Sequence, residues 1–225
     1  MNFKGNYRQL GSHDISELKD KILALTDEEW DKESWRQKHY DVHKYTHTIS
    51  LIFDRDFRHK NPTTLPLYES FRENIEPIIV KIKAYYNKSL KYKRLRKKHG
   101  DGYVIRVNFV KLDASGGDIA PHVDNLFTLS HAHRIHIPII TNDGVLFTIG
   151  NEVKNLKEGE IWEINNREMH SVLNEGKDSR VHMIIDWVIP GERCCCGQKA
   201  RPQGICSPQE CEKTDHVLVP CGCYS

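Results

Sequence analysis

The chain has 225 residues, with 33 Lys and Arg against 31 Asp and Glu, so its formal net charge is only +2. A balance this close to neutral argues against a general role on nucleic acid or on a membrane surface, and we expect neither as a partner. The sequence has no apolar run near the roughly 20 residues that a membrane helix needs, and no apolar stretch at its start to serve as a secretory signal. We therefore expect a cytoplasmic protein whose cysteines stay mostly reduced.

The first part of the chain is predicted to begin with a helix over residues 12–38. Apolar residues recur there at helical spacing between Ile15 and Leu25, with acids and lysines between them. Ser12 is placed to cap the start of this helix. A short β-type run is expected after it, at residues 48–53.

A second helix is predicted over residues 67–88, where an apolar stripe runs from Tyr68 to Tyr85. Pro77 lies inside this stripe, and a helical proline removes a backbone hydrogen bond and crowds the preceding turn, so we expect a kink or a break there. The stretch at residues 88–98 is strongly basic. Because it is short and has Tyr92 as its one aromatic residue, we interpret it as a solvated helix end or loop rather than a nucleic-acid contact.

From Tyr103 onward the pattern changes to short β-rich runs separated by turn residues such as Asn142-Asp143-Gly144. Short strands at such regular spacing are typical of an all-β sandwich or barrel. We therefore expect a mainly β core that follows the helices. Its predicted strands are residues 103–112, 132–140, 145–149, 160–164, 170–174 and 180–189.

The cysteines are confined to the end of the chain, just after Pro190-Gly191. This shift in composition marks the clearest domain boundary in the sequence. The spacing is irregular and lacks paired CxxC units, so two interpretations stay open: a small structural zinc site, to which His216 could add a ligand, or a flexible, redox-sensitive tail. The seven cysteines are Cys194, Cys195, Cys196, Cys206, Cys211, Cys221 and Cys223.

His122 and Asp124 form a His-x-Asp pair within the β region. Residues two apart in an extended segment point to the same side, so both side chains can reach one metal ion. His170 opens a later strand and can supply a third ligand. Two imidazoles and one carboxylate that leave neighbouring positions open are the ligand set of non-heme iron(II) oxygenases.

Two further arginines lie on predicted strands, Arg134 with His136 and Arg180 at the start of the last run. An arginine buried in an apolar strand is costly unless it pairs with a carboxylate, and no dedicated acidic partner for Arg180 is evident in the sequence. A guanidinium in that setting suits the carboxylate of a ligand. From spacing alone, a position for Arg180 at the surface is an equally good interpretation.

Other polar residues are given ordinary structural interpretations. His131 and His133 flank a turn and are expected at the surface, and His182 is placed equally well in the pocket or outside it. For Asn165 and Asn166, turn formation is favoured over support of a metal ligand.

Residues 103–189 resemble the aspartyl/asparaginyl β-hydroxylase family of iron(II)- and 2-oxoglutarate-dependent oxygenases. The resemblance implies a double-stranded β-helix, the cupin-like jelly roll, with Fe(II) and 2-oxoglutarate as cofactors. It also implies that His122 and His170 bind the iron and that Arg134, His136 and Arg180 hold 2-oxoglutarate. The matching segments are PHVDN (121–125), RIHIPIITNDGVLFTIG (134–150), GEIWEINNREMHSVLN (159–174) and RVHMIIDWV (180–188).

Family members that act on protein aspartate can lack the carboxylate ligand, whereas this chain has Asp124 in place. It therefore looks more like the branch that hydroxylates free amino acids, or a branch with other targets. The expected reaction is hydroxylation of an amino acid or of a residue in a peptide or protein, coupled to conversion of 2-oxoglutarate to succinate. A non-catalytic jelly-roll module that binds a metal or a carboxylate ligand is the alternative.

The chain is thus expected to have three parts. Residues 1–100 would form a helical cover, residues 101–190 the jelly-roll oxygenase core, and residues 191–225 the Cys-rich tail.

Overall fold

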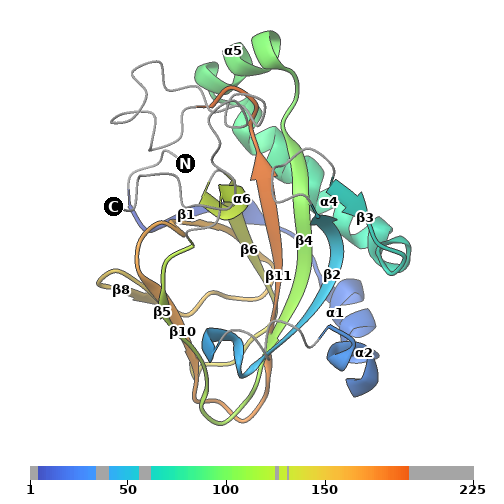
Figure 1. The fold of residues 1–225 in the computed structure, drawn as a ribbon, viewed down its shortest axis with the longest axis vertical. Helices are drawn as coiled ribbons and strands as arrows, with labels where there is room; N and C mark the ends of the chain where they lie inside the picture. Colours follow the sequence, from blue (N-terminus) through green and yellow to red (C-terminus); the bar gives the residue numbers. More distant parts are fainter. Residues whose placement is uncertain (1–4, 34–40, 56–61, 125–126, 131, 193–225) are drawn as a thin grey trace.

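The structure is a computed structural model that describes residues 5–33, 41–55, 62–124, 127–130 and 132–192. Its strands form two sheets, a larger one in the order β1-β9-β6-β11-β4-β2-β3 and a smaller one in the order β5-β10-β7-β8 (Figure 1). The strands are β1 (Tyr7–Ser12), β2 (Thr46–Asp54), β3 (Pro62–Thr64), β4 (Tyr103–Leu112), β5 (Gly117–His122), β6 (His133–Ile140), β7 (Val145–Ile149), β8 (Glu152–Lys154), β9 (Glu160–Ile164), β10 (His170–Asn174) and β11 (Arg180–Val188). The helices are α1 (Ser16–Leu23), α2 (Asp27–Asp31), the 3-10 turn η1 (Asp41–His43), α4 (Tyr68–Asn87), α5 (Leu90–His99) and α6 (Phe127–Ser130).

The predicted β core is confirmed as a jelly roll. Each of the six expected runs is a strand whose ends agree to within one residue, and every strand pair within the two sheets is antiparallel. The two short strands β5 and β8 were not predicted, because their sequences lack a clean apolar alternation. They complete the smaller sheet, so the expected fold class is correct.

Strand β11 shows how the sequence separates the two faces of the larger sheet. Successive side chains of a strand point to opposite faces. Met183, Ile185 and Trp187 pack on one face in the same core cluster as the buried residues of α4, and this helix lies across that side of the sheet (Figure 1). Arg180 and His182 occupy the other face, where His182 approaches Phe147 of the smaller sheet with ring centroids 6.5 Å apart. The polar face of β11 therefore lines the interior between the sheets.

Helix α4 runs through Pro77 without a break, so the expected interruption is not found. Pro77 is on the exposed side of the helix, as is Glu73, whose carbonyl loses its hydrogen-bond partner to the proline ring. Water can satisfy that carbonyl at the surface, while the buried stripe on the opposite side, which includes Ile78 and Ile82, holds the helix on the sheet.

The N-terminal hundred residues contribute more than the expected helical cover. Strand β1 pairs with β9, and β2 pairs with β4, so this part of the chain supplies strands of the larger sheet itself. The helix expected over residues 12–38 is divided: Ser12 ends β1 instead of capping a helix, and Thr26 starts the separate helix α2 with a capping box to Glu29. The tertiary pairing of β1 overrides the local helical pattern near Ser12.

His133 is buried, with 1% of its surface exposed, so the expected surface position is wrong. Its Nδ1 lies 2.6 Å from a carboxylate oxygen of Glu163, and its Nε2 bonds the carboxylate of Glu192. The same two carboxylates accept hydrogen bonds from Tyr86 at 2.9 Å and from Tyr92 at 3.0 Å. This buried ionic cluster ties α4 and α5 to the larger sheet, and the five residues in it come from separated parts of the sequence.

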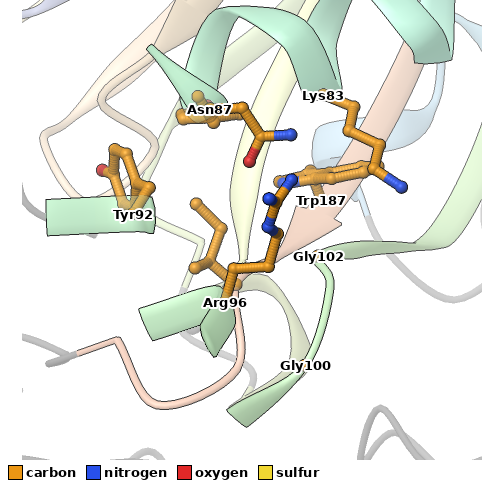
Figure 2. Close-up of a pocket in the computed structure, with 9 residues that line it drawn as sticks. Lys83, Asn87, Tyr92, Arg96, Gly100, Gly102 and Trp187 are labelled. Atoms are coloured by element: carbon orange, nitrogen blue, oxygen red, sulfur yellow. The ribbon is translucent and has the colours of Figure 1, made fainter. Parts of the chain in front are cut away.

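The basic stretch at residues 88–98 forms most of helix α5. Figure 2 shows a small hollow between α4, α5 and β11, in which Lys83 and Arg96 approach the indole of Trp187. Gly102 lies against that indole, and a Cβ there would come within 2.7 Å of Trp187 Cζ2, so only glycine fits. Within the described ranges, no helix is long and apolar enough to cross a membrane. The Cys-rich tail and His131 lie outside the described residues.

Candidate metal centre and ligand pocket

The smaller sheet brings His122 and His170 together. His122 ends β5 and His170 begins β10, and the two residues are register partners in the antiparallel pair. Their ring centroids are 4.2 Å apart. Asp124 follows β5 by two residues, and one ligand atom from each of the three side chains lies within 4.8 Å of the others. The predicted triad is therefore assembled in space, from segments 48 residues apart in sequence.

Backbone carbonyls orient both imidazoles in the same way. His122 Nδ1 is 2.8 Å from the carbonyl oxygen of Ala120, and His170 Nδ1 is 2.9 Å from that of Glu168. A carbonyl only accepts, so each Nδ1 carries the proton and each Nε2 presents a lone pair. This is the arrangement in which a histidine binds a metal through one nitrogen while the other is held by the protein.

Asp124 is buried and held from two directions. Its Oδ2 accepts a hydrogen bond from Asn166 Nδ2 at 3.2 Å and lies 2.9 Å from Arg134 Nη1. Burial alone would raise the pKa of the Asp124 carboxyl, but Arg134 and the nearby histidines outweigh it and hold this pKa below its ordinary value. The side chain is thus an anion, as a metal ligand must be.

Asn166 has a role that the sequence interpretation underrated. Beyond its bond to Asp124, its Nδ2 donates to the carbonyl of Leu129 at 2.9 Å, and its own carbonyl accepts the Asp124 backbone N–H at 3.1 Å. The available signal was its place four residues before His170, but a turn explains an asparagine there equally well. The two neutral imidazole nitrogens and one carboxylate fit iron(II), whose oxygenase sites use this donor set and keep the remaining positions open.

Arg180 lies on the inner face of β11 with 1% of its surface exposed. Its Nη2 donates to His182 Nδ1 at 2.6 Å, while Nε and Nη1 are buried without a hydrogen-bond partner, and no described carboxylate pairs with the side chain. Burial with no compensating anion lowers the pKa of Arg180 to about 9. A buried guanidinium without a paired anion is unfavourable, so this position suits an anionic ligand.

His182 and His136 lie beside Arg180 and present further unsatisfied atoms. Their Nδ1 atoms are 3.2 Å apart, and the Nε2 of each is buried without a partner within the described ranges. Burial and the charge of Arg180 hold the pKa of both imidazoles well below the ordinary value, so both are neutral. Because arginine only donates, His182 Nδ1 accepts, and the proton of His182 sits on Nε2. A carboxylate placed here would satisfy Arg180 and this N–H together.

His136 is near both Arg180 and His170. The charge of Arg180 and the histidine His170 both influence its pKa, and its ring packs 5.2 Å from Phe147. His136 thus lies beside Arg180 on the inner face of the larger sheet and close enough to the triad for His170 to affect its pKa.

Arg134 was also expected to hold 2-oxoglutarate, and its setting differs from that of Arg180. Its Nε and Nη2 donate to the two carboxylate oxygens of Asp186, each at 2.9 Å, and its Nη1 faces Asp124. The sequence interpretation did not identify Asp186 as a partner. The structure thus separates the two arginines, one paired with protein carboxylates and one without such a partner among the described residues.

Residues 92–190 match the family model described as aspartyl/asparaginyl beta-hydroxylase, and this range contains the triad and both arginines. The β core of this chain is therefore similar to that hydroxylase family. The family match, the jelly-roll fold and the triad agree with the resemblance seen in the sequence.

Solved structures are similar to this chain at low identity. A 2OG-Fe(II) oxygenase family oxidoreductase from Burkholderia pseudomallei matches with a TM-score of 0.49 and 12% identity, over 64% of this chain and 66% of that one. A prolyl-4-hydroxylase from Pseudomonas putida matches with a TM-score of 0.46 and 11% identity, over 84% of this chain and 95% of that one. Among proteins of curated function, none matches this chain. Similarity at this level carries no information about its substrate.

Proposed function

We propose that this protein is an iron(II)- and 2-oxoglutarate-dependent dioxygenase that hydroxylates an amino acid or a residue in a peptide or protein. The observation that carries the proposal is the buried, unneutralised Arg180 in the same interior as the His122, Asp124 and His170 triad. A metal-binding jelly roll alone would not need that guanidinium, whereas a 2-oxoglutarate enzyme needs an anchor for the far carboxylate.

The site residues would have two roles, metal binding and carboxylate binding. His122 and His170 offer Nε2 lone pairs and Asp124 offers a carboxylate, and together these would hold Fe(II). Arg180 would pair with the far carboxylate of 2-oxoglutarate, and the Nε2–H of His182 would donate to the same group. The Nε2 of His136, buried without a partner among the described residues, would be available to the same ligand.

When bound, Fe(II) and 2-oxoglutarate supply the oxidising chemistry: one O2 and one 2-oxoglutarate are consumed, and CO2, succinate and the hydroxylated substrate are formed. The protein contributes orientation and exclusion of water. Burial of Arg180, His136 and Asp186 between the sheets gives the carboxylate a site with little competing solvent. Presence of Asp124 supports the branch that acts on amino acids, which the resemblance implies.

The direct test is succinate formation from 2-oxoglutarate by the purified protein with Fe(II) and ascorbate, during a screen of free amino acids and short peptides. A substrate that stimulates succinate formation, with loss of the stimulation in His122→Ala, would support the proposal. Tight binding of 2-oxoglutarate with no succinate across the panel would favour the alternative, a binding module without turnover. Unchanged turnover in His122→Ala would rule out the proposed iron site.

A further inference from the structure

Arg134 connects the candidate metal centre to the interior of the larger sheet. On one side its Nη1 lies 2.9 Å from Asp124 Oδ2. On the other, Nε and Nη2 form a two-pronged bond to Asp186 with both distances at 2.9 Å. Parallel N–H donors on a carboxylate fix the plane of a guanidinium as well as its distance, so the direction of the third nitrogen is also fixed.

The Asp186 end of this connection lies among other buried charged residues. Arg134 and Asp186 are register partners on β6 and β11, and Asp186 is also the register partner of Arg106 on β4. Arg106 in turn pairs with Asp54, which accepts a hydrogen bond from Thr128. Asp186, Arg106, Asp54 and Thr128 are all buried. A row of buried polar and charged side chains therefore runs across the larger sheet to Arg134 and the metal centre.

Asn166, in the segment between β9 and β10, holds Asp124 from a second direction. Its Nδ2 donates to the same oxygen, Oδ2, that faces Arg134, and its backbone holds the Asp124 N–H. Two donors from two directions therefore converge on one oxygen of the carboxylate. These two donors engage both lone pairs of Oδ2, so the carboxylate would bind a metal through Oδ1.

We propose that Arg134 and Asn166 are positioning residues that make Asp124 a one-oxygen ligand, and that Arg134 does not anchor 2-oxoglutarate. The proposal rests on the proposed function, because it takes Asp124 as an iron ligand. Three one-atom ligands leave three of six positions on the ion, two for the keto acid and one for O2. A two-oxygen carboxylate would leave one too few. Arg134 and Asn166 would thus keep open the three coordination positions that the reaction needs.

The contrast with Arg180 supports this division of roles. All three guanidinium nitrogens of Arg134 already face carboxylate oxygens, whereas two nitrogens of Arg180 are buried with no acceptor in the part of the chain that the structure describes. A ligand carboxylate at Arg134 would add a third anion to Asp124 and Asp186, and at Arg180 it would be the first. Repulsion therefore directs the ligand to Arg180.

The experiment measures Mn(II) affinity of the metal-free protein with no 2-oxoglutarate present. Arg134→Lys keeps the positive charge but loses the paired hydrogen bonds to Asp186. Asn166→Ala removes a neutral hydrogen-bond donor to Asp124. Each should weaken Mn(II) binding by about 10- to 100-fold, as is typical when the support of a ligand is lost. The Co(II) absorption spectrum of each variant should also differ from that of the wild type. In the matched control Arg180→Lys, Mn(II) affinity should match the wild type while 2-oxoglutarate binding weakens.

Wild-type Mn(II) affinity in both Arg134→Lys and Asn166→Ala would overturn the proposal, as would loss of 2-oxoglutarate binding alone in Arg134→Lys. Circular dichroism of the metal-free variants establishes that they fold. If Arg134→Lys does not fold, Asp186→Asn supplies the test. It weakens the paired hydrogen bonds from Arg134 while keeping Arg134 and Asp124, and it should also weaken Mn(II) binding. Failure of the proposed function is a separate result: Mn(II) would then bind His122→Ala as tightly as the wild type.

Discussion

His133 on β6 and Glu163 on β9 form a buried pair, with 2.6 Å between the imidazole Nδ1 and a carboxylate oxygen. The second ring nitrogen bonds Glu192 just beyond β11. An imidazole that bridges two carboxylates donates from both nitrogens, so His133 is held in its charged form. Arg8 from β1, whose Nε donates to Glu163 at 2.8 Å, adds a further charge to the cluster.

The His133 cluster makes stability depend on pH above neutrality. Burial alone would lower the pKa of His133, but Glu192 and Glu163 outweigh it and raise this pKa from 6.5 to about 9. A raised pKa stabilises the folded state fully below the ordinary value, and the contribution is lost as pH rises through about 9. The raised pKa contributes on the order of 3 kcal/mol to the free energy of unfolding, at about 1.4 kcal/mol per pKa unit.

Chemical unfolding at a series of pH values from 6 to 10 measures this effect. The free energy of unfolding should fall from about pH 6.5 to about 9, the interval between the ordinary and the raised pKa of His133. In His133→Gln, which cannot be charged, the slope should be much smaller. Equal slopes in the two proteins would show that His133 does not carry the charge. Tyr86 and Tyr92, which donate to the same carboxylates, titrate only above this range because their pKa values are raised.

Removal of either histidine ligand should abolish tight metal binding. His122→Ala and His170→Ala each leave two of three ligands, and neither position belongs to the apolar clusters that hold the fold. Titration calorimetry with Mn(II) should show no tight site in either variant, while circular dichroism stays that of the wild type. A tight site that survives in both would place the metal elsewhere.

Arg180→Met should stabilise the protein in the absence of ligand. The substitution replaces a buried charge that lacks an anion with an apolar side chain of similar length, a change that is often worth about 1–4 kcal/mol. The same variant should lose stabilisation by 2-oxoglutarate, because the anchor of the far carboxylate is gone. The thermal unfolding temperature, measured with and without 2-oxoglutarate, reports both effects. A less stable Arg180→Met protein with normal ligand response would contradict the assignment.

Pro77→Ala should also stabilise the fold, for a local reason. An alanine restores the backbone N–H that can reach the carbonyl of Glu73, and proline in a helix interior costs about 3 kcal/mol relative to alanine. Part of that gain is offset, because proline also restricts the unfolded chain. We expect an increase in the free energy of unfolding of about 1–2 kcal/mol by this reasoning, measured by urea denaturation. Ala84→Pro, on the same exposed helix surface, is the reverse control and should be strongly destabilising.

The sequence by itself determined six strands of the β core and the residues of the triad. Alternation of apolar and polar residues is a local property, so the runs from Tyr103 to Val188 could be placed to within one residue. The His-x-Asp pair and His170 could be selected because ligand chemistry restricts residue types. Both kinds of inference need only neighbouring residues, or a known donor set.

Tertiary structure decided which polar groups are paired. Arg134 and Arg180 begin similar Arg-x-His segments. Arg134 pairs with Asp186 on the neighbouring strand, 52 residues away in sequence, whereas Arg180 meets no carboxylate among the residues that the structure describes. His133 is buried because Glu163 and Glu192 reach it from other elements. Composition and periodicity report what a residue is and which face it takes. The charge that lies opposite is set by strand register, and register depends on the packing of the whole sheet.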